Sequence, residues 1–227
     1  MIEQSLSQSI LTLTLARGNA VNALNEATYD ALHLALTRAQ TDDQVRSVVI
    51  AASGQKAFCA GADLKEYAGL PLEDVEHKQM KFLLRCLVDL IEFPKPVVAA
   101  VHAPAIGAGM MLACACDEIV MAKSAWMSLP EAQINIPAPI AAVIVGRRTG
   151  WSAMQALLQR AERFDAQRCL HHGLADDVVD REDVLGAAQR RLDVYGPIAP
   201  RVYAINKRWL NQDLRAQLEA ASQAVHD

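Results

Sequence analysis

One carboxylate and two turns built from small residues are the features of this sequence that could do chemistry. Glu131 stands among apolar residues in the stretch SLPEAQINIP, with Leu129, Pro130 and Ile134 close by. A carboxyl group held among apolar side chains has a raised pKa, which suits a general acid–base. The structural alternative is a solvated glutamate that begins a helix after Pro130, and this alternative is the commoner one for glutamates in general.

The two small-residue turns are CAGAD at residues 59–63 and PAIGAG at residues 104–109. Each is expected at the C-terminal end of a strand, where backbone N–H groups stay free and a ligand can approach closely. The second turn opens a helix, so its amides share the positive end of the helix dipole. Two such amides aimed at one oxygen would form an oxyanion hole, in which each donor is typically worth roughly 3–4 kcal/mol of barrier. Turns that serve packing alone are the alternative, which the bare pattern favours.

Two other classes of site fit less well. Residues 107–109 begin like a dinucleotide-binding fingerprint, but Leu112 stands where the third glycine is required. Cys114 and Cys116 resemble half of a zinc site, yet a second ligand pair at the usual spacing is missing. The five cysteines are an odd count without a CxxC pair, so we expect buried reduced thiols, with no disulfide and no metal.

The elements that must position these residues follow from hydrophobic periodicity. Strands are predicted at residues 10–15, 45–51, 97–101 and 118–122. Helices are predicted at residues 22–40, 72–91, 110–116, 151–160, 165–171, 183–195 and 200–225. Asn25 or Asn22 is expected to cap the first helix. Strands that alternate with helices, followed by a helical second half, predict an α/β fold.

Composition bounds the class of protein. The chain has 227 residues, 52% hydrophobic and 21% charged, with a formal net charge of −4. This balance predicts a soluble globular protein without an electrostatic footprint for nucleic acid. Residues 97–116 lack charged side chains over about the length of a membrane span, but Pro104 and two glycines interrupt them, so a buried strand, turn and helix are expected instead. The first residues lack the pattern of a secretory signal, so we expect a cytoplasmic protein.

Together the motifs resemble the crotonase superfamily of enoyl-CoA hydratases and isomerases. FCAGADLKE at residues 58–66 closely resembles its first signature, and KPVVAAV at residues 95–101 resembles a characteristic strand. Residues 102–117 resemble the second signature, and Glu131 with the preceding proline falls at the third. The resemblance covers about residues 10–210 and is specific, because three ordered motifs have matching separations.

This resemblance implies a fold, an assembly and a ligand class. The fold is α/β, a crotonase-like spiral of ββα units over residues 1–190. A C-terminal helical trimerisation region at residues 191–227 would pack on this core or on a neighbouring subunit. Members typically form homotrimers or dimers of trimers and bind acyl-CoA or acyl-carrier-protein thioesters. No metal, membrane or nucleic acid partner is implied, and no cofactor apart from the coenzyme A of the substrate.

The resemblance also assigns roles by position. Ala62 and Ala108 are the residues whose N–H groups would hold the thioester oxygen, although the family commonly has glycine at the second position. Glu131 is the expected acid–base. The expected substrate-binding residues are Ala23, Leu24, Ala60, Asp63, Leu64, Lys65 and Met111, with Lys207 or Arg208 at the 3′-phosphate of coenzyme A.

One departure from the hydratases of this family bears on the reaction. Those enzymes hold a water between two glutamates, and the first of these falls at Met111, which can neither accept nor donate a proton. A single-glutamate site followed by IPAPI at residues 136–140 is more similar to the Δ3,Δ2-enoyl-CoA isomerases. A double-bond shift needs one base, which removes a proton from C2 and returns it at C4, and an apolar Met111 would exclude water.

Isomerisation with Glu131 as the single base is therefore favoured over the alternatives. A hydratase or decarboxylase of the same family would need a second group from elsewhere in the pocket. A thioester-binding subunit without turnover is the alternative outside the enzymes. These stay open because Met111 is about as readily explained as a neutral substitution in a packed helix.

Overall fold

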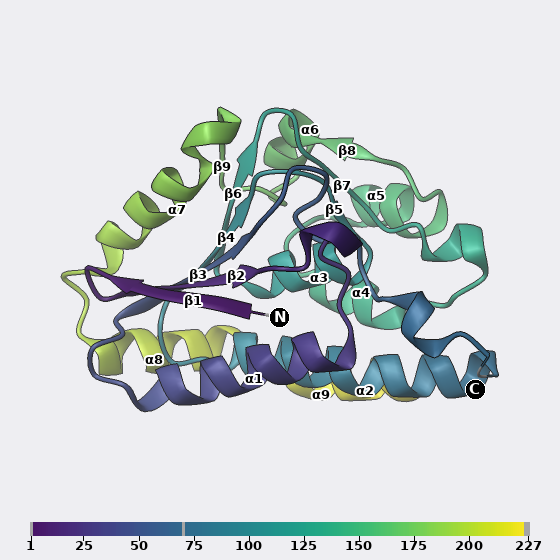
Figure 1. Ribbon diagram of the computed structural model, residues 1–227, viewed down its shortest axis with the longest axis horizontal. Coiled ribbons are helices and arrows are strands. Elements are labelled where there is room, and N and C mark those ends of the chain that lie inside the picture. Colours follow the sequence, from purple (N-terminus) through teal and green to yellow (C-terminus); the bar gives the residue numbers. More distant parts are fainter. Residues whose placement is uncertain (1, 70, 225–227) are drawn as a thin grey trace.

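The computed structural model describes residues 2–69 and 71–224, without the side chains of Tyr67 and residues 72–77. Within these residues the chain has the predicted α/β fold, with helices around a six-stranded sheet and a three-stranded sheet (Figure 1). The order of the larger sheet is β1-β2-β3-β4-β6-β9. Its strands are β1 (Ile2–Ser7), β2 (Ile10–Leu15), β3 (Ser47–Ala52), β4 (Val97–Val101), β6 (Glu118–Ala122) and β9 (Asp177–Val179). Only β1 and β2 pair antiparallel; the other neighbours are parallel.

Burial explains why the central strands were predictable. All five residues of β4 are buried, as a continuous apolar run bounded by prolines predicts for a parallel strand covered on both faces. The strand β1 was not predicted, because most of its residues are exposed and it shows no apolar alternation. It pairs with β2 through a two-residue turn in which Gln8 and Ser9 have φ of 50° and 61°, typical of a tight hairpin.

The smaller sheet lies beside the candidate turns. Its strands are β5 (Ala105–Ile106), β7 (Trp126–Ser128) and β8 (Phe164–Asp165). The pair β5–β7 is parallel and β7–β8 is antiparallel. Strands of two or three residues are too short to show a period, so the sequence could not predict them.

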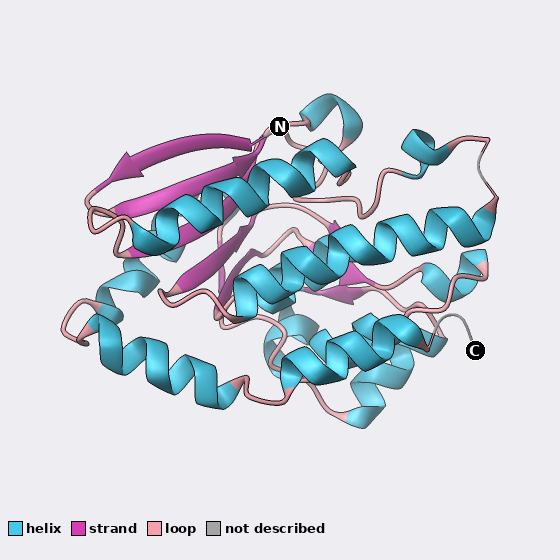
Figure 2. Ribbon diagram, turned by 90° about the horizontal axis from the view of Figure 1, so that it is seen from below, coloured by secondary structure: helices cyan, strands magenta, loops and turns pink. Residues whose placement is uncertain are grey.

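The helices agree closely with the periodicity in the first half of the chain. They are α1 (Glu26–Thr41), α2 (Leu72–Ile91), α3 (Ala108–Ala115), α4 (Pro139–Ile144), α5 (Trp151–Met154), α6 (Ala166–His171), α7 (Val184–Leu192), α8 (Pro200–Leu210) and α9 (Leu214–Gln223). Asn25 caps α1, because its side chain accepts a hydrogen bond from the Thr28 N–H at 3.1 Å. The helices α1 and α2 lie side by side (Figure 2), while α7 packs on β3, β4 and β6 across the sheet from α1.

The C-terminal segment forms two helices, α8 and α9, rather than the single helix predicted at residues 200–225. Residue 225 of the predicted helix lies outside the described residues. Between α8 and α9, the Asn211 side chain donates to the Ile91 carbonyl at 2.8 Å, which ties the break to the end of α2. The helix α9 packs on α2 and α4 and buries Leu214 and Leu218. Within this chain, α9 therefore packs against the helices α2 and α4, and contacts with a neighbouring subunit stay a prediction.

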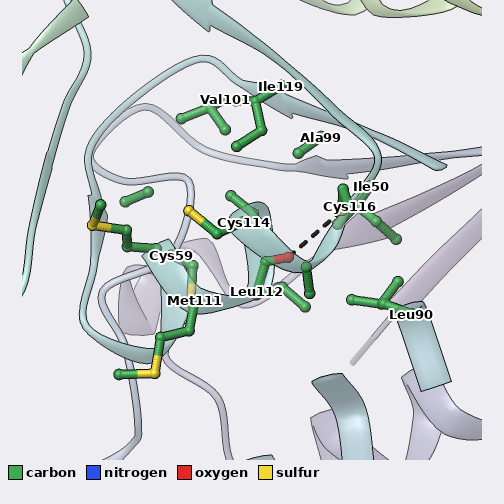
Figure 3. Close-up of a cluster of buried hydrophobic side chains, with 14 of the residues drawn as sticks. Ile50, Cys59, Leu90, Ala99, Val101, Met111, Leu112, Cys114, Cys116 and Ile119 are labelled. Atoms are coloured by element: carbon green, nitrogen blue, oxygen red, sulfur yellow. Dashed lines mark hydrogen bonds between the residues drawn. The ribbon is translucent and has the colours of Figure 1, made fainter. Parts of the chain in front are cut away.

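The helix α3 runs through the middle of the core. All eight of its residues are buried, and most are small, so the sheet and α2 can approach it closely. Figure 3 shows Met111 on the side of α3 away from the strand residues Val101 and Ile119. The thiols are free and buried; burial raises the pKa of Cys114 to about 11 and that of Cys116 to about 12. No helix in the described part of the chain has the length and apolarity that crossing a membrane requires.

Candidate active site

The two small-residue turns run parallel and are hydrogen-bonded to each other. Cys59 and Ala105 form a parallel bridge, and the Ile106 N–H donates to the Cys59 carbonyl at 2.9 Å. Further along the two segments, a Cβ added to Gly61 would stand 3.0 Å from the Ile106 carbonyl oxygen, so the residue before Ala62 lies beside the start of α3. The fold thus joins two turns that are more than forty residues apart in the sequence.

The N–H groups of Ala62 and Ala108 have no acceptor within the described residues. The Gly61 carbonyl accepts from Leu24 at 2.8 Å, and the N–H of Ala62 belongs to the same trans peptide, so it points the opposite way. Ala108 is the first residue of α3, where amides have no partner inside the helix. A Cβ added to Gly61 would stand 3.6 Å from the Ala108 nitrogen, which shows how close the two segments lie.

Gly109 allows this close approach. A Cβ at this position would collide with the Cys59 carbonyl oxygen and lie 2.7 Å from the Cys59 Cβ. The backbone of α3 therefore rests directly on the first turn, and no side chain fits between them.

The carboxylate of Glu131 lies beside the N-terminus of α3. The residue follows β7 and begins the short 3-10 helix η3 (Glu131–Ile134). A Cβ added to Gly107 would stand 2.6 Å from the Glu131 Oε1 atom, so the carboxylate lies against the Gly107 Cα, one residue before Ala108. The Gly107 N–H donates to the Ser128 carbonyl at 2.9 Å, which fixes the end of β7 to the start of α3. Gly107 has φ of +54°, a conformation that disfavours any side chain.

The carboxylate of Glu131 is poorly solvated. Its Oε2 atom is buried and has no hydrogen-bond partner among the described residues. Burial accordingly raises the pKa of Glu131 above that of an ordinary glutamate. The raised pKa predicted from the apolar neighbours is thus confirmed, and its cause is the predicted one.

One pocket joins these groups. It encloses about 830 Å³, part of which is open to solvent. Six of the predicted site residues line it: Ala60, Ala62, Leu64, Ala108, Met111 and Glu131. The helices α1 and α2, which were not expected at the site, supply Tyr29, Gln79, Met80 and Leu83. The helical spacing of Met80 and Leu83 predicted an apolar face, but nothing in the pattern showed that this face adjoins a cavity.

Four other predicted substrate-binding residues do not line this pocket. Leu24 is buried and supports the first turn through its bridge to Ala62, and Ala23 precedes it. Asp63 pairs with Arg17 at 2.8 Å. Lys65 is exposed in η2 (Leu64–Tyr67).

Lys207 requires a correction. It was expected at the 3′-phosphate of coenzyme A, but its side chain is 5% exposed and its Nζ atom lies 2.7 Å from the Asp117 carboxylate. The same carboxylate oxygen accepts the Val97 N–H at 2.8 Å. Lys207 is therefore an internal charge partner that holds α8 on the core, whereas the neighbouring Arg208 is exposed.

Comparison with known proteins assigns the family. The sequence model described as "Enoyl-CoA hydratase/isomerase" matches residues 5–227. The chain belongs to this family. It is 31% identical to a putative enoyl-CoA hydratase/isomerase of Bacillus subtilis, over 96% of this chain and 85% of the relative. It is also 29% identical to carboxymethylproline synthase of Pectobacterium carotovorum, over 100% of this chain and 92% of the relative.

Solved structures agree with the crotonase-like fold. A probable enoyl-CoA hydratase of Mycobacterium tuberculosis superposes with a TM-score of 0.90 at 26% identity, covering 99% of this chain and 94% of that chain. An enoyl-CoA hydratase of Mycobacterium smegmatis gives 0.88 at 28% identity, covering 99% and 89%. The predicted superfamily and fold are confirmed. The names of the relatives include hydratases, a dehydratase and a synthase, so family membership does not separate isomerisation from hydration.

Proposed function

We propose that this protein forms the enolate of an acyl-CoA thioester and moves the double bond of a 3-enoyl-CoA to the 2-position, with Glu131 as the single acid–base. The position of the Glu131 carboxylate supports this proposal most strongly. The carboxylate lies against Gly107, next to the free N–H of Ala108, in a pocket whose described lining holds no other carboxylate.

The reaction follows from these positions. The thioester oxygen accepts hydrogen bonds from the N–H groups of Ala62 and Ala108, which makes the protons on C2 more acidic. Glu131 removes one of them, and the electron pair spreads over the dienolate as negative charge on the held oxygen. The protonated Glu131 then returns the proton to C4, so the double bond lies between C2 and C3 and the carboxylate is regenerated.

The raised pKa of Glu131 suits both halves of this cycle. A carboxylate in an apolar pocket is a stronger base than one in water, and its acid form persists long enough to donate to C4. The buried Oε2 atom has no hydrogen-bond donor among the described residues, so none of them competes with the substrate for this oxygen.

Met111 favours isomerisation over hydration. It is 4% exposed and lines the pocket from α3, together with Glu131 and Ala108. Hydration requires a water that is held and deprotonated at C3 while C2 is protonated, and one carboxylate beside an apolar side chain is poorly suited to that task. Hydration is the second candidate, since relatives named as hydratases are 26% to 32% identical to this chain.

The test is incubation of the purified protein with a 3-enoyl-CoA and, separately, with a 2-enoyl-CoA. Isomerisation of the first without formation of 3-hydroxyacyl-CoA from the second supports the proposal, and rapid hydration of the second overturns it. Glu131→Gln should abolish turnover but retain thioester binding. Glu182→Gln, at an exposed position outside the pocket, is the matched control and should retain turnover.

We also propose that the chain assembles as a homotrimer or a dimer of trimers through its C-terminal helices. Support comes from α8, where Trp209 is 63% and Leu210 is 85% exposed, because large apolar side chains exposed together favour a protein interface. Size-exclusion chromatography with light scattering should give the mass of three or six chains. The mass of a single chain at micromolar concentration would contradict the proposed assembly.

A further inference from the structure

Gln79 places an unpaired amide in the wall of the acyl pocket. It lies on α2, and with Met80 and Leu83 it forms the face of that helix that lines the cavity. Its Nε2 atom is buried and has no hydrogen-bond partner among the described residues. Neither the fold nor the proposed chemistry uses this amide.

A buried N–H group without an acceptor is costly, so such groups are normally paired with protein or ligand. Among the described residues no group accepts a hydrogen bond from this one. The stretch after Glu131 contributes the apolar side chains of Ile134, Ile136 and Ile140 to the same lining. A ligand that carries an oxygen into the pocket would supply the acceptor that Gln79 lacks.

We propose that the acyl group of the substrate carries a neutral oxygen, a hydroxyl or a carbonyl, which accepts a hydrogen bond from the Gln79 amide. This rests on the proposed function, in which the same pocket holds the acyl chain of a thioester. It goes further, because it assigns Gln79 as a specificity-determining residue and excludes a plain hydrocarbon chain as the preferred substrate.

The charge of the lining explains why the oxygen is neutral. The described residues around the pocket include no lysine, arginine or histidine, and Glu131 already contributes a poorly solvated carboxylate. A second carboxylate on the acyl chain would be buried near Glu131 without a counter-ion, which is strongly unfavourable. An amide both donates and accepts, so it matches a hydroxyl group particularly well.

The test measures binding without turnover. Three saturated acyl-CoA thioesters of equal chain length, ending in a methyl, a hydroxyl or a carboxylate group, are titrated calorimetrically, for chains of four to eight carbons. The hydroxyl thioester should bind more tightly than the methyl thioester by roughly tenfold or more at the best chain length. The carboxylate thioester should bind weakest.

Gln79→Leu should remove the preference for the hydroxyl thioester or reverse it, and should fold at least as stably, because it removes an unpaired polar group. Gln167→Leu, at an exposed position of α6 outside the pocket, is the matched control and should keep the preference. A wild-type preference for the methyl or carboxylate thioester overturns the inference, as does a hydroxyl preference that survives in Gln79→Leu.

Turnover of a 3-enoyl-CoA is measured in parallel to separate the two proposals. Isomerisation without a hydroxyl preference overturns the assignment of Gln79 and leaves the proposed function standing. A hydroxyl preference without isomerisation overturns the proposed reaction and supports the assignment. Absence of any thioester binding overturns both.

Discussion

At the scale of single residues, the site depends on a carboxylate held in an apolar pocket against a glycine. The neighbours of Glu131 in the sequence are proline and aliphatic residues, and these signalled its raised pKa. The contact with Gly107 gave no such signal, because it joins residues on different elements. The sequence also did not predict Gln79 in the pocket, since a glutamine in an amphipathic helix is typical of the solvated face.

The buried carboxylate predicts how stability depends on pH. Burial raises the pKa of Glu131 above its value in the unfolded chain, so the folded state binds more protons between the two values. The free energy of unfolding therefore falls as pH rises through that window. Glu131→Gln, which mimics the protonated acid, should be more stable than wild type at neutral pH and equal to it below both pKa values. Urea denaturation across pH tests this; a less stable variant at neutral pH would contradict it.

Gly107→Ala should damage the site directly. The new methyl group would stand 2.6 Å from the Glu131 Oε1 atom, and φ of +54° strains any side chain there. We expect a loss of about 1–3 kcal/mol in stability and roughly a hundredfold in kcat. Gly150→Ala is the control, because nothing lies within 4 Å of the Cβ that would be added there. Its kcat should equal that of the wild-type protein. Equal kcat for Gly107→Ala and wild type would count against the assigned position of Glu131.

At the scale of elements, the periodicity predicted β2, α2, β4 and β6 with their observed bounds. These are long or fully buried, so their patterns are strong. The short strands around the pocket were missed because tertiary pairing, not local preference, makes them strands. The start of α3 at Ala108 was predicted two residues late, since a helix cap with positive φ at Gly107 interrupts the pattern.

Gly109→Ala tests the contact between α3 and the first turn. The added methyl group would meet the Cys59 backbone, which cannot yield as a flexible side chain does. We expect about 1–3 kcal/mol of destabilisation and a larger fall in kcat than in thioester affinity, because the Ala108 amide moves with α3. The control is Gly186→Ala in α7, where only the flexible end of Arg190 lies near, at 3.3 Å. Thermal unfolding and steady-state kinetics measure the stability, the kcat and the thioester affinity of both variants. Equal values for Gly109→Ala and Gly186→Ala would contradict the contact between α3 and the first turn.

At the scale of the whole molecule, the motifs predicted the superfamily and its fold, but not how the C-terminal helices attach. Lys207 was misjudged because its partner Asp117 is 90 residues away, and no local pattern distinguishes it from the exposed Arg208. The pocket shows the same limit: its two turns were recognisable, while the helices that complete it were not.

Lys207→Met should destabilise the protein by about 3–5 kcal/mol, because it leaves the Asp117 carboxylate buried without its cation. Arg208→Met should change stability by less than about 0.5 kcal/mol. Where Lys207→Met remains folded, its affinity for coenzyme A should equal that of wild type. A stable variant that binds coenzyme A weakly would instead support the original phosphate assignment.

Proton exchange at C2 reports on Glu131 without any product being formed. A saturated acyl-CoA is incubated with the protein in D₂O, and deuterium at C2 is followed by mass spectrometry. The wild-type protein should exchange the C2 protons, because Glu131 removes them while the amides of Ala62 and Ala108 hold the enolate oxygen, and Glu131→Gln should not. Equal exchange by the two proteins, or none by the wild type, would contradict the assignment of Glu131 as the base.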